Sequence, residues 1–277
     1  MSESGDGLLG PLFHALPLWG VGLLLFAVCI FAREAGALFF RRLKARDPEA
    51  LDSGKDTDSY IITAIFALLA FVIGLSLSIA LDRFEGRRAL VVDEANAIST
   101  SYLRAELFDE PYRSQLQATL RDYARTRIAP DGLWDARMEA QLARSLALRT
   151  RLWEETRTAV YPVRETELGS YFIEAINDVL NVGTRRQLAG RANIPARIVD
   201  VLFIYIIAAA AVLGYVLGDR PGLKRQATTV LLLLFSIMIM TILDLDRPQS
   251  GAIQVPQRAL EDLVATLDRD GPPPVRP

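Results

Sequence analysis

Four long apolar stretches constrain this chain more than any other feature of its sequence. They are Ala15–Ala32, Tyr60–Leu81, Val201–Gly218 and Ala227–Leu243, and none contains a charged residue. Their lengths of 17 to 22 residues are close to the roughly 20 that an α-helix needs to cross a hydrocarbon layer of about 30 Å. The sequence therefore predicts an all-α integral membrane protein with four transmembrane helices.

The first stretch raises the question of a cleaved signal peptide. Ala35-Gly36-Ala37 has the small-x-small pattern of a cleavage site, but the residues before the stretch include Glu3 and Asp6 and no Lys or Arg. A signal peptide normally begins with a basic region. We therefore expect the first stretch to remain as a transmembrane helix.

Composition excludes several classes of function. The chain is 51% hydrophobic and 23% charged, with a net charge of −2, so no basic surplus indicates nucleic acid as a partner. A single cysteine, Cys29, and a single histidine, His14, exclude an internal disulfide framework and the two-histidine metal motifs. Motifs of hydrolases, zinc proteases and dinucleotide-binding proteins are absent. We expect no enzyme activity, no cofactor and no metal.

The apolar stretches divide the chain into five parts. Residues 1–59 hold the N-terminal tail, the first span and a basic loop; residues 60–81 form the second span. Residues 82–197 are predicted to form a helical extramembrane domain, residues 198–245 the third and fourth spans, and residues 246–277 a C-terminal segment ending in a disordered, proline-rich tail.

Within residues 82–197, apolar residues recur at helical spacing. The first stripe is Leu116, Leu120 and Tyr123; the second is Met138, Leu142, Leu146, Trp153 and Val160; the third is Leu168, Phe172, Ile176, Val179 and Leu180. We predict three or four packed helices, the first continuing from the second span through Leu103. A short amphipathic helix is expected around Leu260, Leu263, Val264 and Leu267.

Basic residues in short loops predict the orientation of a membrane protein. Nine lie on one side, namely Arg33, Arg41, Arg42, Lys44, Arg46, Lys55, Arg220, Lys224 and Arg225. The C-terminal tail holds four and the N-terminal tail none. In a bacterial inner membrane, this count places both termini and the helical domain outside the cytoplasm. Arginines flanking the second and third spans on the domain side favour the reverse orientation.

A first candidate site consists of charges at two helix ends. The second and fourth spans run in the same direction, so both end on the side of the helical domain. We expect Asp82, Arg83, Asp244, Asp246 and Arg247 to gather there, because unpaired ions near hydrocarbon are costly. The cluster is either an electrostatic lock between helices or a charged ring at a pore mouth.

A second candidate site lies one turn or more beyond the second span, at Asp93, Glu94 and Asn96. On a helix, Asp93 and Asn96 share a face, whereas Glu94 and Asn96 point about 200° apart. The simplest expectation is that the carboxylates pair with arginines such as Arg87 or Arg104.

Small residues inside the spans form two ladders. Ala70, Gly74 and Ser78 recur every fourth residue in the second span, and Ala210, Gly214 and Gly218 do so in the third. Such ladders allow the backbones of two helices to approach closely. The same faces could line a water-filled path if several subunits surround it.

Three segments carry a family resemblance: ALDRFEGRRALVVDEANAISTSYLRA (80–105), LRDYARTRI (120–128) and LDLDRPQSGAIQV (243–255). Together with the four-span layout, they resemble a bacterial family of membrane proteins described as bestrophin-like. Bestrophins are pentameric ion channels with four spans per subunit, a helical cytosolic region and cytosolic termini. Their calcium-binding acidic cluster and pore-neck residues do not align with this chain, so the resemblance predicts neither gating nor selectivity.

Two functions follow from these observations. The first is an ion channel or other pore-forming homo-oligomer in a lipid bilayer, with inorganic ions as its cargo. The second is a non-conducting membrane sensor or scaffold that binds a partner through the helical domain. Oligomeric state separates them, because a ring can enclose a central pore and a monomer cannot.

Overall fold

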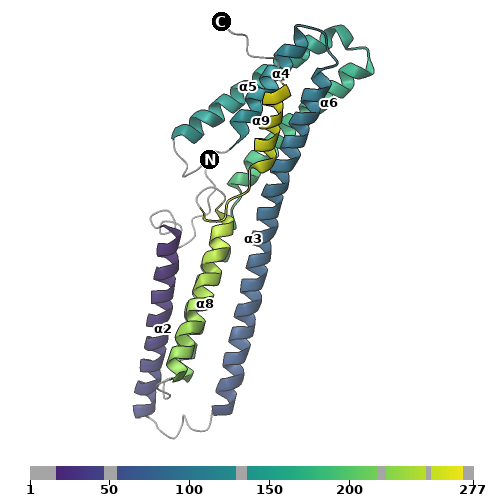
Figure 1. Cartoon of the computed structure of the whole chain (residues 1–277). Coiled ribbons are helices and arrows are strands. Elements are labelled where there is room, and N and C mark those ends of the chain that lie inside the picture. The colour runs from purple at the N-terminus through teal and green to yellow at the C-terminus, as the bar shows by residue number, and fades with distance from the viewer. Residues whose placement is uncertain (1–16, 47–54, 129–135, 218–222, 248–250, 271–277) are drawn as a thin grey trace. The chain divides into compact units, whose positions relative to one another are not determined.

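The computed structural model of the chain describes residues 17–46, 55–128, 136–217, 223–247 and 251–270. No strand occurs in these ranges, and nearly every residue lies in a helix (Figure 1). In chain order the helices are α2 (Leu18–Arg46), α3 (Lys55–Ala105), α4 (Tyr112–Arg127), α5 (Ala136–Val160), a 3-10 turn (Tyr161–Val163), α6 (Glu167–Arg191), α7 (Ala196–Val216), α8 (Leu223–Asp246) and α9 (Arg258–Asp270).

The chain divides into two compact units. A membrane unit contains Met1–Asp82 and Asn193–Arg247, and a helical unit contains Arg83–Ala192 and Pro248–Pro277. Helix α3 contributes to both units, because it continues without a break from the second apolar stretch to Ala105. The C-terminal helix α9, which the sequence placed in a segment of its own, belongs to the helical unit.

The four predicted spans are all long apolar helices in the structure. Four helical stretches are long and apolar enough to cross a membrane. Their inner faces bury residues such as Leu69, Ile206 and Leu232, whereas bulky apolar side chains such as Phe31 and Phe71 remain exposed at 76% and 66%. Exposed apolar surface on this scale is what a helix facing lipid presents.

Helix α2 is longer than the sequence indicated. We expected residues 33–59 to form a loop, but α2 continues to Arg46. Arg33 is therefore not a loop residue: its side chain is buried within the membrane unit. It was missed because a single arginine at the end of an apolar stretch is normally taken as the boundary of the span.

Glycine allows α2 and α7 to pack at very close range. A Cβ atom on Gly36 would collide with the backbone of Ala211, and a Cβ atom on Gly214 would collide with the carbonyl group of Arg33. Backbone atoms cannot move aside as a flexible side chain can. Gly214 of the α7 ladder therefore lies at a close contact between two helices of one chain, which is the kind of approach that small residues allow.

The helical unit has one apolar core. The predicted stripe on α4 is confirmed, since Leu116, Leu120 and Tyr123 are fully buried. The stripe on α6 supplies Phe172, whose ring meets that of Phe108 edge to face, with ring centroids 4.8 Å apart. Helix α9, predicted as a short amphipathic helix, adds its own buried face of Leu260 and Leu267.

The predicted face of α5 is only partly right. Val160 is buried as predicted, but Leu146 and Trp153 are exposed at 46% and 43%. Ser145, Leu152, Thr156 and Ala159 are also buried, and two of these four are polar, so the apolar pattern misplaced the middle of the buried face. Thr156 satisfies its hydroxyl by donating to the carbonyl oxygen of Leu152 within α5.

Candidate functional site: a buried carboxylate between two arginines

Glu94 lies on the inner face of α3 in the helical unit. Its neighbours on that face, Val91, Ala95 and Ile98, belong to the apolar core, and Glu94 itself is 0% exposed. A carboxylate removed from water costs several kcal/mol unless it is paired and hydrogen-bonded. The position of Glu94 in the helical repeat therefore demands partners from the elements that pack on α3.

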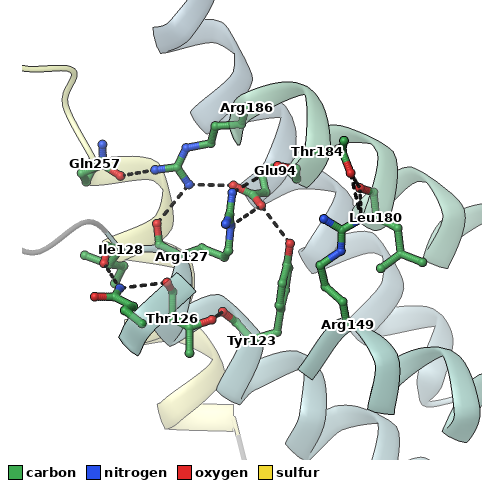
Figure 2. A network of polar contacts seen from close by, with 12 residues as sticks. Glu94, Tyr123, Thr126, Arg127, Ile128, Arg149, Leu180, Thr184, Arg186 and Gln257 are labelled. Carbon is green, nitrogen blue, oxygen red and sulfur yellow. Dashed lines mark hydrogen bonds and ion pairs between the residues drawn. The ribbon is translucent and has the colours of Figure 1, made fainter. Parts of the chain in front are cut away.

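Three side chains bind the carboxylate (Figure 2). Nε of Arg127 lies 2.6 Å from Oε1 of Glu94, and Nη1 of Arg186 lies 2.6 Å from Oε2. The hydroxyl of Tyr123 donates a third hydrogen bond to Oε1 at 3.1 Å. Each oxygen thus accepts a short, charge-assisted bond, and the contact joins α3 to α4 and α6.

The two arginines extend the network beyond Glu94. Arg186 donates from Nη1 to the carbonyl oxygen of Arg127 at 3.0 Å and from Nη2 to Oε1 of Gln257 at 2.6 Å. Arg127 donates from Nη2 to the carbonyl oxygen of Gly183 at 3.3 Å. Gln257 stands immediately before α9. The network therefore ties the segment leading into α9 to the side chain that Glu94 projects from α3 (Figure 2).

Helix α5 and the end of α4 are held by similar bonds. Arg149 of α5 donates to the carbonyl oxygen of Leu180 at 3.0 Å and to the hydroxyl of Thr184 at 2.8 Å, both on α6. Gln141 of α5 donates to the carbonyl oxygens of Thr126 and Ile128 at the end of α4. The backbone oxygens of Thr126 and Ile128 lie at the end of α4 and lack helical partners, so the side chain of Gln141 supplies their donors.

Two cations face one anion in this cluster. Burial opposes the charge of Arg127, but the attraction of Glu94 outweighs it and raises the pKa of Arg127. For Arg186, burial outweighs the attraction of Glu94 and lowers its pKa. Arginine is effectively always protonated in proteins, so both guanidinium groups stay charged at neutral pH. Burial and the nearby Glu94 carboxylate raise the pKa of Tyr123, which keeps its hydroxyl protonated as a donor.

Gly183 makes room for the centre of the network. A Cβ atom at this position would lie 2.5 Å from the hydroxyl oxygen of Tyr123 and 3.1 Å from Oε1 of Glu94. Both contacts are shorter than van der Waals distance, so a side chain here would displace the polar groups. Among the described residues, no group of three His, Cys, Asp or Glu side chains is placed to hold a metal.

The partners expected for Glu94 from the sequence are wrong. Arg87 donates to the carbonyl oxygens of Ala189 and Ala192, at 3.1 and 2.7 Å. Arg104 donates to the carbonyl oxygen of Tyr171 at 2.7 Å. Both arginines serve backbone groups of α6 and its end. The actual partners of Glu94 lie 33 and 92 positions away in sequence, beyond the range of a local helical repeat.

Asp93 and Asn96 lie on the other side of α3 from the network. Both are exposed, whereas Glu94 between them is buried. This is the arrangement that their angular positions on a helix require. Asp93 makes no ion pair within the part of the chain that the structure describes.

The residues of the helix-end charge cluster occupy different environments. In the membrane unit, Asp82 is exposed, Asp244 and Asp246 are buried and Arg247 is half-buried. The carboxylate of Asp246 accepts the backbone N–H of Ile194, at 2.9 and 3.0 Å from its two oxygens. Arg83 is half-buried and belongs to the helical unit. Their gathering at one membrane face stays a prediction.

The two small-residue ladders differ in how the chain covers them. Ala210 and Gly214 are buried on α7, and Gly218 lies outside the described residues. On α3, Ala70, Gly74 and Ser78 are all exposed. No atom lies within 4 Å of a Cβ atom built on Gly74. Within the part of the chain that the structure describes, the ladder of α3 is therefore left uncovered.

Comparison with solved structures shows a shared fold. A bacterial bestrophin homologue from Klebsiella pneumoniae, solved as several variants, matches with 15% identity over 91% of this chain and 96% of that one, at a TM-score of 0.57. A second variant of that protein matches with 16% identity over 90% of this chain and 95% of that one, at a TM-score of 0.55. A structure described as a membrane protein matches with 13% identity over 94% of this chain and 99% of that one, at 0.59. Comparison with curated proteins found no match.

These features define a multi-pass membrane protein with four apolar helices and a helical unit braced by a buried ion-pair network. The profile of the bestrophin-like domain matches residues 26–260, most of the chain. The chain therefore belongs to the bestrophin-like family.

Proposed function

We propose that this chain is the subunit of a homo-oligomeric ion channel in the bacterial inner membrane, with α3 lining the pathway. The observation that carries the proposal is the open small-residue face of α3. One side of the helix packs on the chain through Leu69, Ile73 and Ser76, while Ala70, Gly74 and Ser78 are exposed.

This small-residue face differs from the lipid-facing surface beside it. Leu68, Phe71 and Leu75 are exposed at 50%, 66% and 53% and provide the bulky apolar surface that lipid accommodates. Small and hydroxyl-bearing residues are instead typical of close helix contacts and of water-filled paths. A ring of subunits would provide both the close helix contacts and the water-filled path, because copies of α3 can meet around a central axis.

Family membership supports the same function. The solved relative from Klebsiella pneumoniae is described as a bestrophin homologue, and bestrophins conduct ions. In the helical unit, α3 also exposes Asp93, Asn96 and Thr100, which form a polar surface suited to contact with an ion. The buried network fixes this part of α3 from its opposite side through Glu94. In this proposal the network is structural and no residue is catalytic.

Cysteine accessibility tests the proposal directly, because Cys29 is the single cysteine of the chain and is buried. In a Cys29→Ser background, Ser78→Cys places a thiol on the open face, and Ser76→Cys places one on the buried face as a matched control. We expect a charged, water-soluble thiosulfonate to modify Ser78→Cys and reduce ion flux in liposomes, and to leave Ser76→Cys unaffected.

Oligomeric state decides between the channel and a non-conducting sensor or scaffold. We expect the protein mass in each nanodisc to be at least twice the 30.7 kDa of one chain, as for an oligomer. A monomer that gives no ion flux would contradict the channel and support the scaffold. Equal modification and equal loss of flux at both cysteines would contradict the placement of α3 at the pathway.

A further inference from the structure

The far end of α2 projects beyond the helices against which it packs. Arg33 of α2 donates to the carbonyl oxygen of Arg225 at 3.2 Å and to the hydroxyls of Thr228 and Thr229 at 3.2 and 2.6 Å. Gly22, further back on α2, faces Met240, so the two helices are antiparallel. At 1.5 Å per residue, α2 runs about 20 Å from Arg33 to its end, whereas α8 begins about 8 Å before Thr228.

The projecting part is basic, and the surface before it is apolar. Residues 41–46 contain Arg41, Arg42, Lys44 and Arg46 and no acidic residue. Arg42 and Arg46 are exposed. One turn earlier, Leu38 and Phe39 are exposed at 52% and 60%. An apolar surface followed by a basic helix end is the pattern of a helix that passes from hydrocarbon into the headgroup layer.

A second group of arginines lies at the start of α8. Oε1 of Glu34 accepts from Nη2 of Arg33 at 2.7 Å and from Nη2 of Arg225 at 3.1 Å. One carboxylate therefore serves two guanidinium groups. Arg33 is buried, but the side chain of Arg225 is 62% exposed. The first turn of α8 contains no acidic residue, so among the described residues here Glu34 is shared between Arg33 and Arg225 and is not available to the arginines at the end of α2.

We infer that the basic end of α2, with Arg42 and Arg46 one turn apart on its exposed surface, is a binding site for the phosphate headgroup of an anionic phospholipid. The guanidinium groups match a phosphate through charge-assisted hydrogen bonds. The exposed apolar residues of the preceding turn match the acyl chains that the same lipid carries. A free phosphate would bind the arginines but would not contact the apolar surface beside them, so the arrangement favours a lipid.

The test compares lipids on the full-length protein. Phosphatidylglycerol or phosphatidylcholine is titrated into detergent-solubilised protein, bound lipids are counted by native mass spectrometry, and the thermal unfolding midpoint is followed. We expect phosphatidylglycerol to bind and raise the midpoint, and phosphatidylcholine to have little effect. In Arg42→Gln/Arg46→Gln, binding should weaken about 25-fold, from about fivefold for each basic residue removed near a charged headgroup layer.

Two matched variants serve as controls. Arg42→Lys/Arg46→Lys keeps the charges and should keep most of the binding. Arg144→Gln/Arg157→Gln removes two exposed arginines from α5 in the helical unit and should leave the lipid response unchanged.

Three results would overturn the inference. The first is an equal response to both lipids, and the second is unchanged affinity in Arg42→Gln/Arg46→Gln. The third is the same stabilisation by inorganic phosphate at matched concentration, which would indicate a site for free anions. The comparisons of phosphatidylglycerol with phosphatidylcholine and with phosphate use the unaltered protein. They therefore test whether the site binds an anionic phospholipid even if a variant folds poorly.

Discussion

Oε2 of Glu94 lies 2.6 Å from Nη1 of Arg186, although the two residues are 92 positions apart in the chain. Arg127 occupies the other carboxylate oxygen at the same distance. Glu94 is fully buried and the side chains of Arg127 and Arg186 are only 11% and 14% exposed. The carboxylate therefore neutralises part of the charge that two arginines bring into the interior of the helical unit.

Removal of this carboxylate charge should strongly destabilise the helical unit. Glu94→Gln leaves two buried guanidinium groups without an anion, and we expect the free energy of unfolding to fall by about 3 to 5 kcal/mol. Asp93→Asn is the matched control, because it removes an exposed carboxylate from the adjacent position and should change stability by less than about 0.5 kcal/mol. Denaturant titration of both variants in detergent measures the difference, and equal effects would contradict a bracing role for Glu94.

Gly183 should tolerate no side chain. The Cβ atom of Gly183→Ala would displace the Tyr123 hydroxyl and Glu94, and overpacking of this kind costs about 1 to 3 kcal/mol. Gly190 lies on the same helix, and no atom would lie within 4 Å of its Cβ. Gly190→Ala should therefore stabilise the protein by up to about 1 kcal/mol. Thermal unfolding of the pair should show shifts of opposite sign; two shifts of the same sign would be inconsistent with the close contact.

Stability should fall at alkaline pH because of Tyr123. Burial and Glu94 raise its pKa above the ordinary value of 10.0, so the folded state retains the proton that the unfolded state releases. This contribution is fully present below pH 10 and is lost progressively as pH rises from there toward the higher pKa of the folded state. The unfolding midpoint, measured from pH 8 to 11, should fall less steeply in Tyr123→Phe than in the unaltered protein. Identical slopes would exclude Tyr123 as the cause.

Long-range pairing explains which parts of the structure could be predicted from the sequence. Four uncharged stretches, the stripes on α4 and α6 and the amphipathic α9 all have local periodic patterns that the fold retains. Glu94 was singled out, but its partners Tyr123, Arg127 and Arg186 were not, and neither was Gln257, which accepts a hydrogen bond from Arg186. The helical unit has many arginines, and nothing local distinguishes the two that reach Glu94. A glutamate in step with Val91 and Ile98 on an apolar face was the one available signal that it is buried.

The faces of helices were less predictable where polar residues turn inward. Ser145 and Thr156 of α5 are buried while Trp153 is exposed, so hydrophobicity alone misplaced the middle of the buried face of this helix, although Val160 at its end is buried as predicted. Arg33 was counted as a loop residue for the same reason, because charge was taken to mean exposure. The structure instead surrounds it with Glu34, two threonine hydroxyls and a carbonyl oxygen.

Asp246 provides a further prediction in the membrane unit. Its carboxylate accepts the buried N–H of Ile194, so Asp246→Ala leaves this donor unsatisfied at a cost of about 1 to 3 kcal/mol. Asp246→Asn keeps an acceptor oxygen and should cost less. If Asp246 instead belongs to a charged ring around the pathway, Asp246→Asn should alter ion selectivity in liposomes with little effect on folding. Unfolding and flux measurements on the two variants distinguish a lock from a ring.

The orientation of the protein in the membrane is predicted from its basic residues, and the structure changes which of them count as loop residues. Arg33 is buried, so it no longer counts among the short-loop charges. Eight basic residues remain on that side, compared with four in the C-terminal tail. Short loops bias orientation more than long domains, which can translocate despite their charges, so we expect the helical unit to lie outside the cytoplasm. A reporter active only in the periplasm should then function when fused after Leu133, and one active only in the cytoplasm should not. The reverse result would show that the arginines flanking α3 and α7 dominate insertion, and would give this chain the cytosolic termini of bestrophins.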